Sequence, residues 1–285
     1  MSNQKFTYGS DPELCLFDKE KNRIVSSIPV LKRDKNNPID LGKGIRMYFD
    51  NVLVETSFPP TETKEKFISE LKYVLTKMHK FLGNRYQLIP KAAHFYDNEE
   101  LKDEKAWEAG CDPNFDFWEE RINTPIEFTN NLRTGSCHFH VGNEKLTELE
   151  TRHTALKLMD IFLGCSSVIF DKDKSSKTRR VYYGASGEFR PTYYGLEYRV
   201  ISPYVLNSPK LMELSLDLID YSLSNLENGE KIIKSIKPEE VKTAINKCNK
   251  KLAEKILSQV SLPTKLIDRV KKDYKFKKLH QEWGI

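Results

Sequence analysis

His138-Phe139-His140-Val141 is the stretch of this 285-residue sequence that decides its predicted fold. Polar and apolar residues alternate here, which is typical of a β-strand because successive strand side chains point to opposite faces. Both imidazoles then project from the same face, at positions where a core strand would normally carry apolar side chains. We therefore predict a strand from Ser136 to Val141 that presents chemically active groups on one face of a sheet.

Three other segments also place polar residues inside predicted strands. They are Gly9-Ser10-Asp11-Pro12-Glu13, Asp50-Asn51-Val52-Leu53-Val54-Glu55 and Gly195-Leu196-Glu197-Tyr198-Arg199-Val200. The two-residue period puts Asp11 with Glu13, and Glu197 with Arg199, on common faces. Because several carboxylates buried together are costly unless a cation neutralises them, the sequence predicts a divalent-metal site. Carboxylate ligands favour magnesium or manganese over zinc.

Each of these pieces also has an ordinary structural explanation. A His-x-His pair occurs by chance in exposed strands, Glu197-x-Arg199 is the pattern of a cross-strand ion pair, and Asp11-Pro12 is typical of a turn. Their combination is more specific, because carboxylates, imidazoles and arginines together are the inventory of a metal–nucleotide phosphoryl-transfer site. The residues of this set are Glu13, Glu55, His138, His140, Arg180, Arg190, Glu197 and Arg199.

The first half of the chain predicts mainly strands. Residues 5–18 predict extended structure interrupted at Gly9 to Pro12, and Ile45 to Thr56 predicts one strand. Thr61 to Leu82 has helical spacing of its apolar residues. Residues 91–134 show little periodicity, which in a compact domain is typical of a functional loop or a lid.

The second half predicts mainly helices. Thr147 to Glu150 has the pattern of a capping box, opening an amphipathic helix that reaches about Phe170. Residues 181–204 predict two strands, and Ser208-Pro209 begins another helix with proline at its first position. Strands first, a mixed middle and helices last predict an α+β fold with an antiparallel sheet.

The composition is that of a globular intracellular protein. Hydrophobic residues make up 39% and charged residues 31%, and the net charge is only +5. Five cysteines without a C-x-x-C pair fit reduced thiols better than a disulfide framework or a zinc ribbon. We find neither an N-terminal apolar leader nor a run of about 18 apolar residues, so we expect a cytoplasmic protein without a membrane span. The lysines after position 264 predict either a solvated helix end or a contact for an acidic partner or nucleic acid.

Taken in order, the four segments resemble the phage carboxylate–amine (COOH–NH2) ligases of type 2. Gly-Cys-Asp-Pro-Asn-Phe (110–115), Arg-Val-Tyr-Tyr-Gly-Ala-Ser-Gly-Glu-Phe-Arg (180–190) and the extension to Ser202 also carry this resemblance. It spans roughly residues 6 to 206. The chain departs from the family pattern at Ser136-Cys137, at Glu188 and at Ser202-Pro203-Tyr204, which concerns the substrate pockets more than the metal machinery.

The resemblance implies a glutamine-synthetase-like catalytic domain over residues 1–206, similar also to glutamate–cysteine ligase. Its curved antiparallel sheet, flanked by helices, would hold ATP and two or three Mg²⁺ ions (or Mn²⁺), with a helical C-terminal region, 207–285, packed on it. The implied metal ligands are Asp11, Glu13, Glu55, His138 and Glu197. The implied contacts to the nucleotide phosphates and the acyl phosphate are His140, Arg180, Arg190 and Arg199.

The activity implied is an ATP-dependent amide-bond ligase that works through an acyl phosphate. The carboxylate donor could be an amino acid such as glutamate, and the amine acceptor a small amine, a peptide, a protein or a modified DNA base. Asp50 and Glu188 are candidates for the general base, and Trp107, Trp118 and residues 91–134 for a cover that excludes water. A guanidino-kinase-like phosphotransferase, a catalytically silent nucleotide-binding relative and a divalent-metal hydrolase are the alternatives, and the oligomeric state, including a homo-oligomer, is left open.

Overall fold

The computed structural model describes residues 5–108, 114–124 and 130–285. Its centre is an eleven-stranded sheet in which every recorded pair of neighbouring strands is antiparallel. Helices accompany the sheet and make up the C-terminal region. The predicted α+β class with an antiparallel sheet is confirmed, whereas the division of the chain at residue 206 stays a prediction.

The strands of this sheet are β1 (Thr7–Asp18), β2 (Arg23–Val25), β3 (Ile39–Gly42), β4 (Ile45–Asp50), β5 (Leu53–Ser57), β6 (Tyr86–Ile89), β8 (Phe115–Asp116), β9 (Arg121–Ile122), β11 (Cys137–Gly142), β12 (Glu188–Thr192) and β13 (Gly195–Tyr198). They follow the order β3-β4-β5-β1-β11-β13-β12-β8-β9, and β2 and β6 also pair with β1. A separate two-stranded ladder joins β7 (Ala93–Phe95) to β10 (Leu132–Thr134).

β1 is continuous and links the two halves of the sheet. Residues 7–12 pair with β11, and Glu13 and Leu14 pair with β5 on the other side. The expected interruption at Gly9 to Pro12 is therefore wrong. Pro12 has no N–H to donate to a ladder, and it lies at the point where β1 changes partners, so the strand tolerates it.

A tight hairpin replaces the single strand expected from Ile45 to Thr56. β4 ends at Asp50 and β5 begins at Leu53, and Asn51 between them has a φ of 56°. Asparagine is one of the few residues with a side chain that accepts this left-handed conformation readily. The turn folds β5 back along β4, so that Glu55 lies opposite Tyr48.

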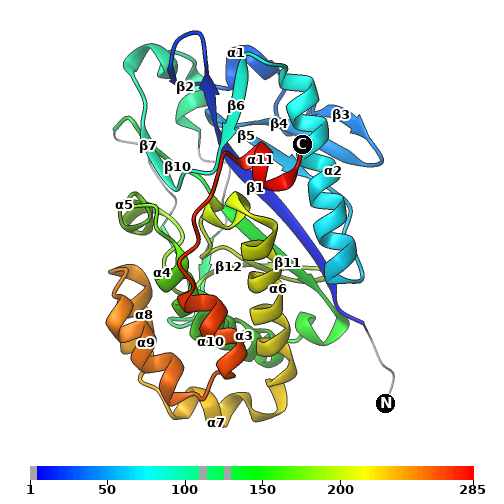
Figure 1. Ribbon diagram of the computed structural model, residues 1–285. Coiled ribbons are helices and arrows are strands. Elements are labelled where there is room, and N and C mark those ends of the chain that lie inside the picture. Colours follow the sequence, from blue (N-terminus) through cyan, green and yellow to red (C-terminus); the bar gives the residue numbers. More distant parts are fainter. Residues whose placement is uncertain (1–4, 109–113, 125–129) are drawn as a thin grey trace.

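The helices are α1 (Ile28–Leu31), α2 (Lys64–Leu82), α3 (Leu149–Met159), α4 (Cys165–Phe170), α5 (Ser176–Tyr182), α6 (Pro209–Ser224), α7 (Gly229–Lys234), α8 (Pro238–Asn246), α9 (Lys250–Gln259), α10 (Thr264–Lys271) and α11 (Leu279–Trp283). In Figure 1, α2 and α6 lie in front of the long strands, and the C-terminal segment after α10 runs past α6 to α11 beside α2. The indole of Trp283 in α11 is buried and donates to the carbonyl of Leu206 over 2.7 Å.

The predicted helix up to Phe170 is present, but it begins differently from the expectation. Thr147 ends a 3-10 helix, and its hydroxyl donates to the carbonyl of Glu144, so it does not form the expected capping box. A π-helical turn, Asp160–Gly164, joins α3 to α4. Contrary to expectation, the run Leu149–Phe170 is long and apolar enough to cross a membrane, yet 78% of its most apolar window is buried inside the fold, as in the core helix of a globular domain.

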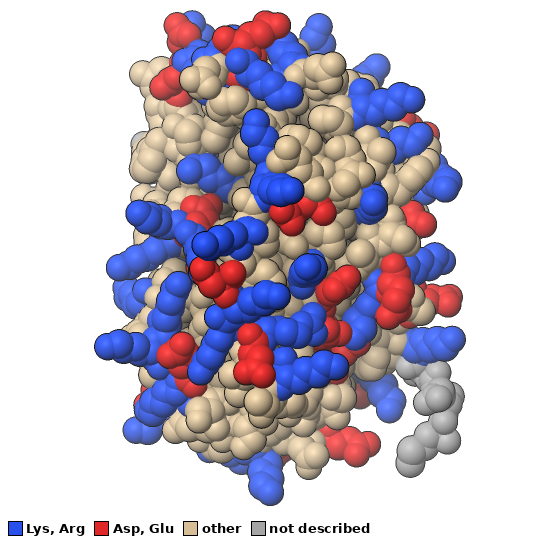
Figure 2. All heavy atoms as spheres, viewed as in Figure 1, with Lys and Arg blue, Asp and Glu red and all other residues tan. Residues whose placement is uncertain are grey.

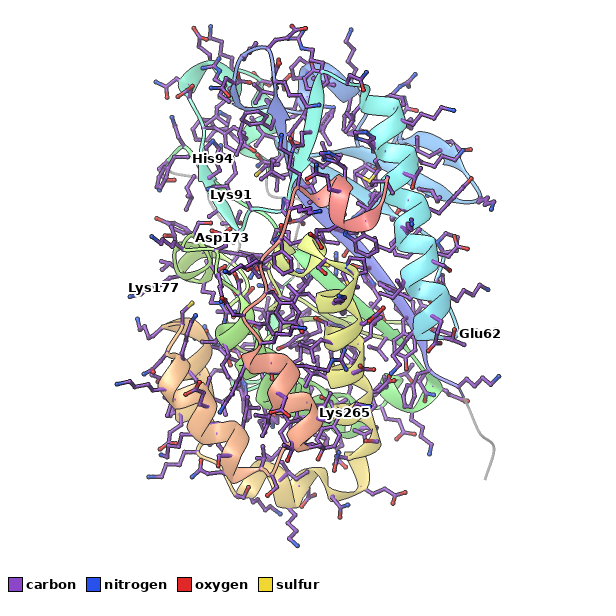
Figure 3. The ribbon with its side chains drawn as sticks, viewed as in Figure 1. Glu62, Lys91, His94, Asp173, Lys177 and Lys265 are labelled. Carbon is purple, nitrogen blue, oxygen red and sulfur yellow. The ribbon has the colours of Figure 1, made fainter. Side chains whose placement is uncertain are left out.

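Lysines and arginines are spread over the helical face, with acidic residues between them (Figure 2). Among the C-terminal charges, Arg269 donates to Asp217, and the acidic Asp273 pairs with Lys172. Lys265, labelled in Figure 3, lies on α10 and is exposed. The two expectations for this region, a solvated helix end and a contact for an acidic partner or nucleic acid, both stay predictions.

Ser208→Ala is expected to lower the free energy of unfolding by about 1 kcal/mol. The Ser208 side chain caps α6 by accepting the N–H of Lys210 over 3.2 Å, and alanine leaves that donor without its partner. Urea unfolding followed by circular dichroism measures the change. Ser224→Ala, at the exposed end of the same helix, is the control and should change the stability by a few tenths of a kcal/mol at most.

Candidate functional site

The register of the sheet gathers the predicted residues on one face. Residues directly opposite each other on neighbouring strands share a face, as do alternate residues along one strand. Four opposed pairs contain predicted site residues: Asp11–His138, Glu13–Glu55, His140–Glu197 and Arg190–Glu197. The two-residue spacings within β1 and β11 connect these pairs into a continuous row across β5, β1, β11, β13 and β12.

The opposite face of the same strands is apolar. Phe139, Leu196 and Tyr198 alternate with the site residues and are almost fully buried. The helix layer packs against this part of the molecule, because α3 and the turn before it contact β13. Helix packing therefore fixes the strands from one side and leaves the polar row on the other.

A carboxylate oxygen and two imidazole nitrogens converge at the centre of the row. Asp11 Oδ1 lies 3.1 Å from His138 Nδ1 and 3.1 Å from His140 Nε2, and Glu197 Oε1 lies 3.6 Å from His138 Nδ1. Asp11 Oδ1 and the two nitrogens are buried, and none has a hydrogen-bond partner of acceptable geometry within the described residues. A cation between them would satisfy all three atoms.

Asp11, His140 and Glu197 can each offer one ligand atom within 4.8 Å of the others, and we call this set the first cation site. The resemblance had given His138 the ligand role and His140 a place nearer the phosphates. In the structure both rings direct a nitrogen toward Asp11, so His140 is at least as well placed to be a ligand.

Glu13, Asp50 and Glu55 form a second acidic group, the second cation site, whose ligand atoms also lie within 4.8 Å of one another. Burial, followed by the negative charges of Asp50 and Asp11, raises the pKa of both Glu13 and Glu55 well above the ordinary value. Burial likewise raises the pKa of Asp50 to about 6. These shifts express the cost of two buried carboxylates, Glu13 and Glu55, beside the partly buried Asp50, which a divalent cation would offset.

Two arginines hold the Glu197 carboxylate. Arg190 donates through Nε and Nη2 over 2.8 and 3.0 Å, and Arg199 donates through Nε over 2.8 Å. Arg199 is completely buried, whereas a quarter of the Arg190 side chain is exposed. Arg190 is therefore the arginine that a ligand can reach directly.

Arg180 lies apart from this row, which corrects the expectation that it contacts a phosphate. Its guanidinium donates to the carbonyl of Ile245 over 2.8 Å and to the hydroxyl of Ser167 over 3.1 Å, among the helices. The adjacent Arg179, which the sequence analysis passed over, is fully buried and faces the strands. It donates to Gly135 O, Ser136 Oγ, Arg199 O, Val200 O and Ile201 O. Arg179 thus ties the residue after β13 to the start of β11.

Of the two candidate bases, Asp50 is the one that lies in an acidic group. Glu188 is opposite Asp116 on β8, and its Oε2 accepts the N–H of Gly184 over 2.6 Å, so this carboxylate holds a loop. Trp118, one of the two tryptophans expected to cover the site, is hydrogen-bonded to the helix layer. Its Nε1 donates to Asp160 over 2.8 Å, which turns the indole toward that layer. Asp160, in the π-helical turn, also accepts from Ser186, Gly187 and Tyr198.

The described residues of the segment 91–134 are not the irregular loop that was expected. They include four short strands and two 3-10 helices. Trp107 lies over the guanidinium of Arg133, which is anchored to Asn51 in the β4–β5 turn. Much of the motif at 110–115, with Cys111, falls outside the described residues, and the lid remains a prediction.

A hollow of about 670 Å³ opens beside the first cation site. Besides Asp11, His140 and Glu197, its lining includes Lys35, Tyr48, Phe58, Arg190, Tyr193 and Tyr194. Lys35 and Tyr48 were not predicted as site residues. Tyr48 could have been found, because it is two residues from Asp50 on the same face and its hydroxyl donates to Glu55 over 2.9 Å. Lys35 follows no regular pattern, so its place in the hollow could not have been predicted from the sequence.

Comparison with known proteins gives a match to one family model and distant likenesses to solved structures, two of which are described below. Residues 129–282 match the family described as "Phage phiEco32-like COOH.NH2 ligase-type 2". This match extends beyond residue 206, where the resemblance seen in the sequence ended. No curated protein matches the sequence.

Solved structures resemble the chain only weakly. A bifunctional glutathione synthetase from Pasteurella multocida superposes with a TM-score of 0.43 at 13% identity, over 94% of this chain and 46% of that protein. The chain therefore spans about half the length of that synthetase. A protein described as apo GmaS without ligand gives a TM-score of 0.34 at 11% identity, over 94% of this chain and 72% of the other.

Glu55→Gln is expected to raise the stability of the metal-free protein by about 1 kcal/mol, the equivalent of roughly one pKa unit of relieved repulsion. The amide keeps an acceptor for Tyr48, and at a pH above the raised pKa of Glu55 it removes one of three neighbouring negative charges. Thermal unfolding in the presence of a chelator measures this. Glu62→Gln, on the exposed residue labelled in Figure 3, should have no such effect. A clear loss of stability in Glu55→Gln would contradict the crowding of charges.

Proposed function

The chain belongs to the phage phiEco32-like COOH–NH2 ligase family of type 2, and from this premise we propose that it joins a carboxylate to an amine in a reaction that consumes ATP. The proposal includes magnesium dependence and an acyl-phosphate intermediate. The observation that carries it is the row of acids and imidazoles on one sheet face, which divides into two candidate cation sites beside a hollow lined by Arg190 and Lys35.

The residues fit divalent cations. The oxygen of Asp11 and the nitrogens of His138 and His140 are buried atoms that converge, and a cation between them would satisfy all three. The second cation site is all carboxylate, which suits the hard Mg²⁺ ion. Magnesium, when bound, would offset the charge of phosphate oxygens and of the substrate carboxylate.

The hollow beside the first cation site is the natural place for the nucleotide phosphates. Arg190 lines it and presents a planar guanidinium, which can hold two phosphate oxygens at once. Lys35 adds a second positive charge on the same lining. Arg199 is buried behind Glu197, so its role is to set the charge and orientation of that carboxylate.

In the first step, an oxygen of the donor carboxylate forms a bond to the γ-phosphorus of ATP, and the bond to the bridging oxygen breaks to release ADP. In the second, the amine nitrogen bonds to the acyl carbon and phosphate leaves. The proton lost by the amine needs an acceptor at the second cation site. Asp50, which lies at the acidic end of the row, is the carboxylate that we propose for this role.

No side chain needs to form a covalent bond with the substrate in this scheme. The protein contributes position and a fixed electrostatic environment, which are strongest when the groups cannot reorganise. The antiparallel ladder between Asp11 and Glu197 supplies that rigidity, since each ligand is on a strand that is paired on both sides.

Glu197→Gln and Glu13→Gln, one from each cation site, should each lower ATP-dependent ADP formation about 100-fold or more, because each removes a ligand charge from the site of transfer. Full-length protein is incubated with ATP, Mg²⁺ and panels of amino acids and amines, and ADP, free phosphate and product mass are scored. The exposed Glu62→Gln serves as the matched control. Circular dichroism verifies that the variants are folded.

The products decide between reaction classes. Free phosphate in equal amount to ADP, together with an amide product, supports the ligase. Phosphate that stays on the acceptor would instead indicate a phosphotransferase. Undiminished turnover in both glutamine variants would remove the assignment of the two cation sites.

A further inference from the structure

Asp50 has less support from the sheet than the other two carboxylates of the second cation site. Glu13 and Glu55 lie opposite each other inside β1 and β5, whereas Asp50 is the last residue of β4 and pairs with Leu53 across the turn. The three carboxylates repel one another when they are ionised. A residue at a strand end moves more easily under such repulsion than one inside a ladder, so contacts of the turn itself decide where Asp50 lies.

The side chain of Asn51, the residue after Asp50, binds the turn to two distant segments. Its Oδ1 accepts the N–H of Val52 over 2.8 Å and the Nε–H of Arg133 over 3.0 Å. Its Nδ2 donates to the carbonyl of Glu108 over 3.0 Å. Because a backbone N–H and a guanidinium only donate and a carbonyl only accepts, the direction of each hydrogen bond is unambiguous.

Arg133, on β10, is itself held in a fixed position. Its side chain is buried, with 1% of the residue exposed. Beyond Asn51, the guanidinium donates to the carbonyls of Ala106, Asn130 and Leu132 over 2.7 to 2.9 Å. The guanidinium carbon lies 4.6 Å from the ring centre of Trp107, a cation–π contact.

A guanidinium is suited to this arrangement because its donors form a rigid, planar fork that can bind several oxygens at once. Its acceptors belong to three separate parts of the chain: the β4–β5 turn, the 3-10 helix Glu104–Trp107 and β10 with the residue pair before it. Arg133 therefore joins the turn next to Asp50 to two segments that are distant in sequence.

We propose that Asn51 and Arg133 are positioning residues that hold Asp50 in the second cation site. The inference rests on the proposed function, because it takes the acidic group to bind a cation. Without the Asn51 contacts, the turn moves Asp50 away from Glu13 and Glu55, and the second site loses a ligand. Trp107, expected to cover the site, packs instead on the arginine that holds the turn.

Calorimetry with Mn²⁺ alone tests the two cation sites separately in the full-length protein. A Glu197→Gln background leaves the second site, and a Glu55→Gln background leaves the first. Asn51→Gly removes the side-chain contacts, while glycine readily keeps the positive φ of the turn. It should weaken Mn²⁺ binding at the second site about 10-fold, and at the first site far less. Arg133→Met should show the same difference between the sites.

Asn22→Gly is the matched control. Asn22 is exposed, has a φ of 52° and lies in the turn from β1 to β2, away from both sites. Its replacement should leave both affinities unchanged. A merely structural role of Asn51 would lower the melting temperature without distinguishing the sites. Unchanged Mn²⁺ binding at the second site in Asn51→Gly, or an equal loss at both sites, would overturn the inference.

Amide hydrogen exchange of the metal-free protein tests the turn without a cation. In Asn51→Gly and in Arg133→Met, the amides of residues 50–54 should exchange about 10-fold faster than in the wild type, and those of β11 at the wild-type rate. Unchanged exchange at 50–54 would count against the inference. Absence of Mn²⁺ binding in the Glu197→Gln background would count against the proposed function instead, and the exchange rates then still decide whether Asn51 and Arg133 hold the turn.

Discussion

The structure depends on keeping several carboxylates close together on a buried sheet face. Asp11, Glu13, Asp50 and Glu55 come from strands whose spacing is set by backbone hydrogen bonds, so they cannot move apart to relieve repulsion. Their burial makes each additional charge costly, as the raised pKa values of Glu13 and Glu55 express. A rigid scaffold is therefore a requirement of the site, and the apolar opposite face provides it through helix packing.

Arginines of the protein offset part of the negative charge on this face. Arg190 and Arg199 offset the charge of Glu197, and Arg179 holds the neighbouring backbone through several carbonyls. The acidic group around Glu55 has no arginine against its carboxylates among the described contacts, and Tyr48 is its nearest donor. The two ends of the row consequently differ: one is partly neutralised and holds imidazoles, and the other is acidic and made only of oxygen ligands.

The sequence alone was sufficient for the α+β class and for most of the site, because a two-residue period decides which side chains share a face. This period was enough to predict that His138 shares a face with His140, and that Glu197 shares a face with Arg199. The pairing of residues on neighbouring strands could not be predicted from this period. The opposition of Glu13 to Glu55, and the place of Asp50 beside them, depend on the β4–β5 turn at Asn51, which the sequence analysis read as uninterrupted strand. Arg180 was placed wrongly because a helix, not a strand, precedes Tyr183, so the neighbouring Arg179 faces the sheet instead. Lys35 follows no regular period, and only the tertiary fold brings it to the hollow.

The continuity of β1 also sets a scale for whatever the sheet face binds. Asp11 and Glu13 belong to different cation sites but are separated by one residue of a single strand, and two residues of strand rise by about 6.6 Å. β1 therefore holds the two sites at a fixed separation. An insertion of one residue between them would turn one acid to the apolar face, so the spacing between the two sites cannot change by a single residue without the loss of a ligand.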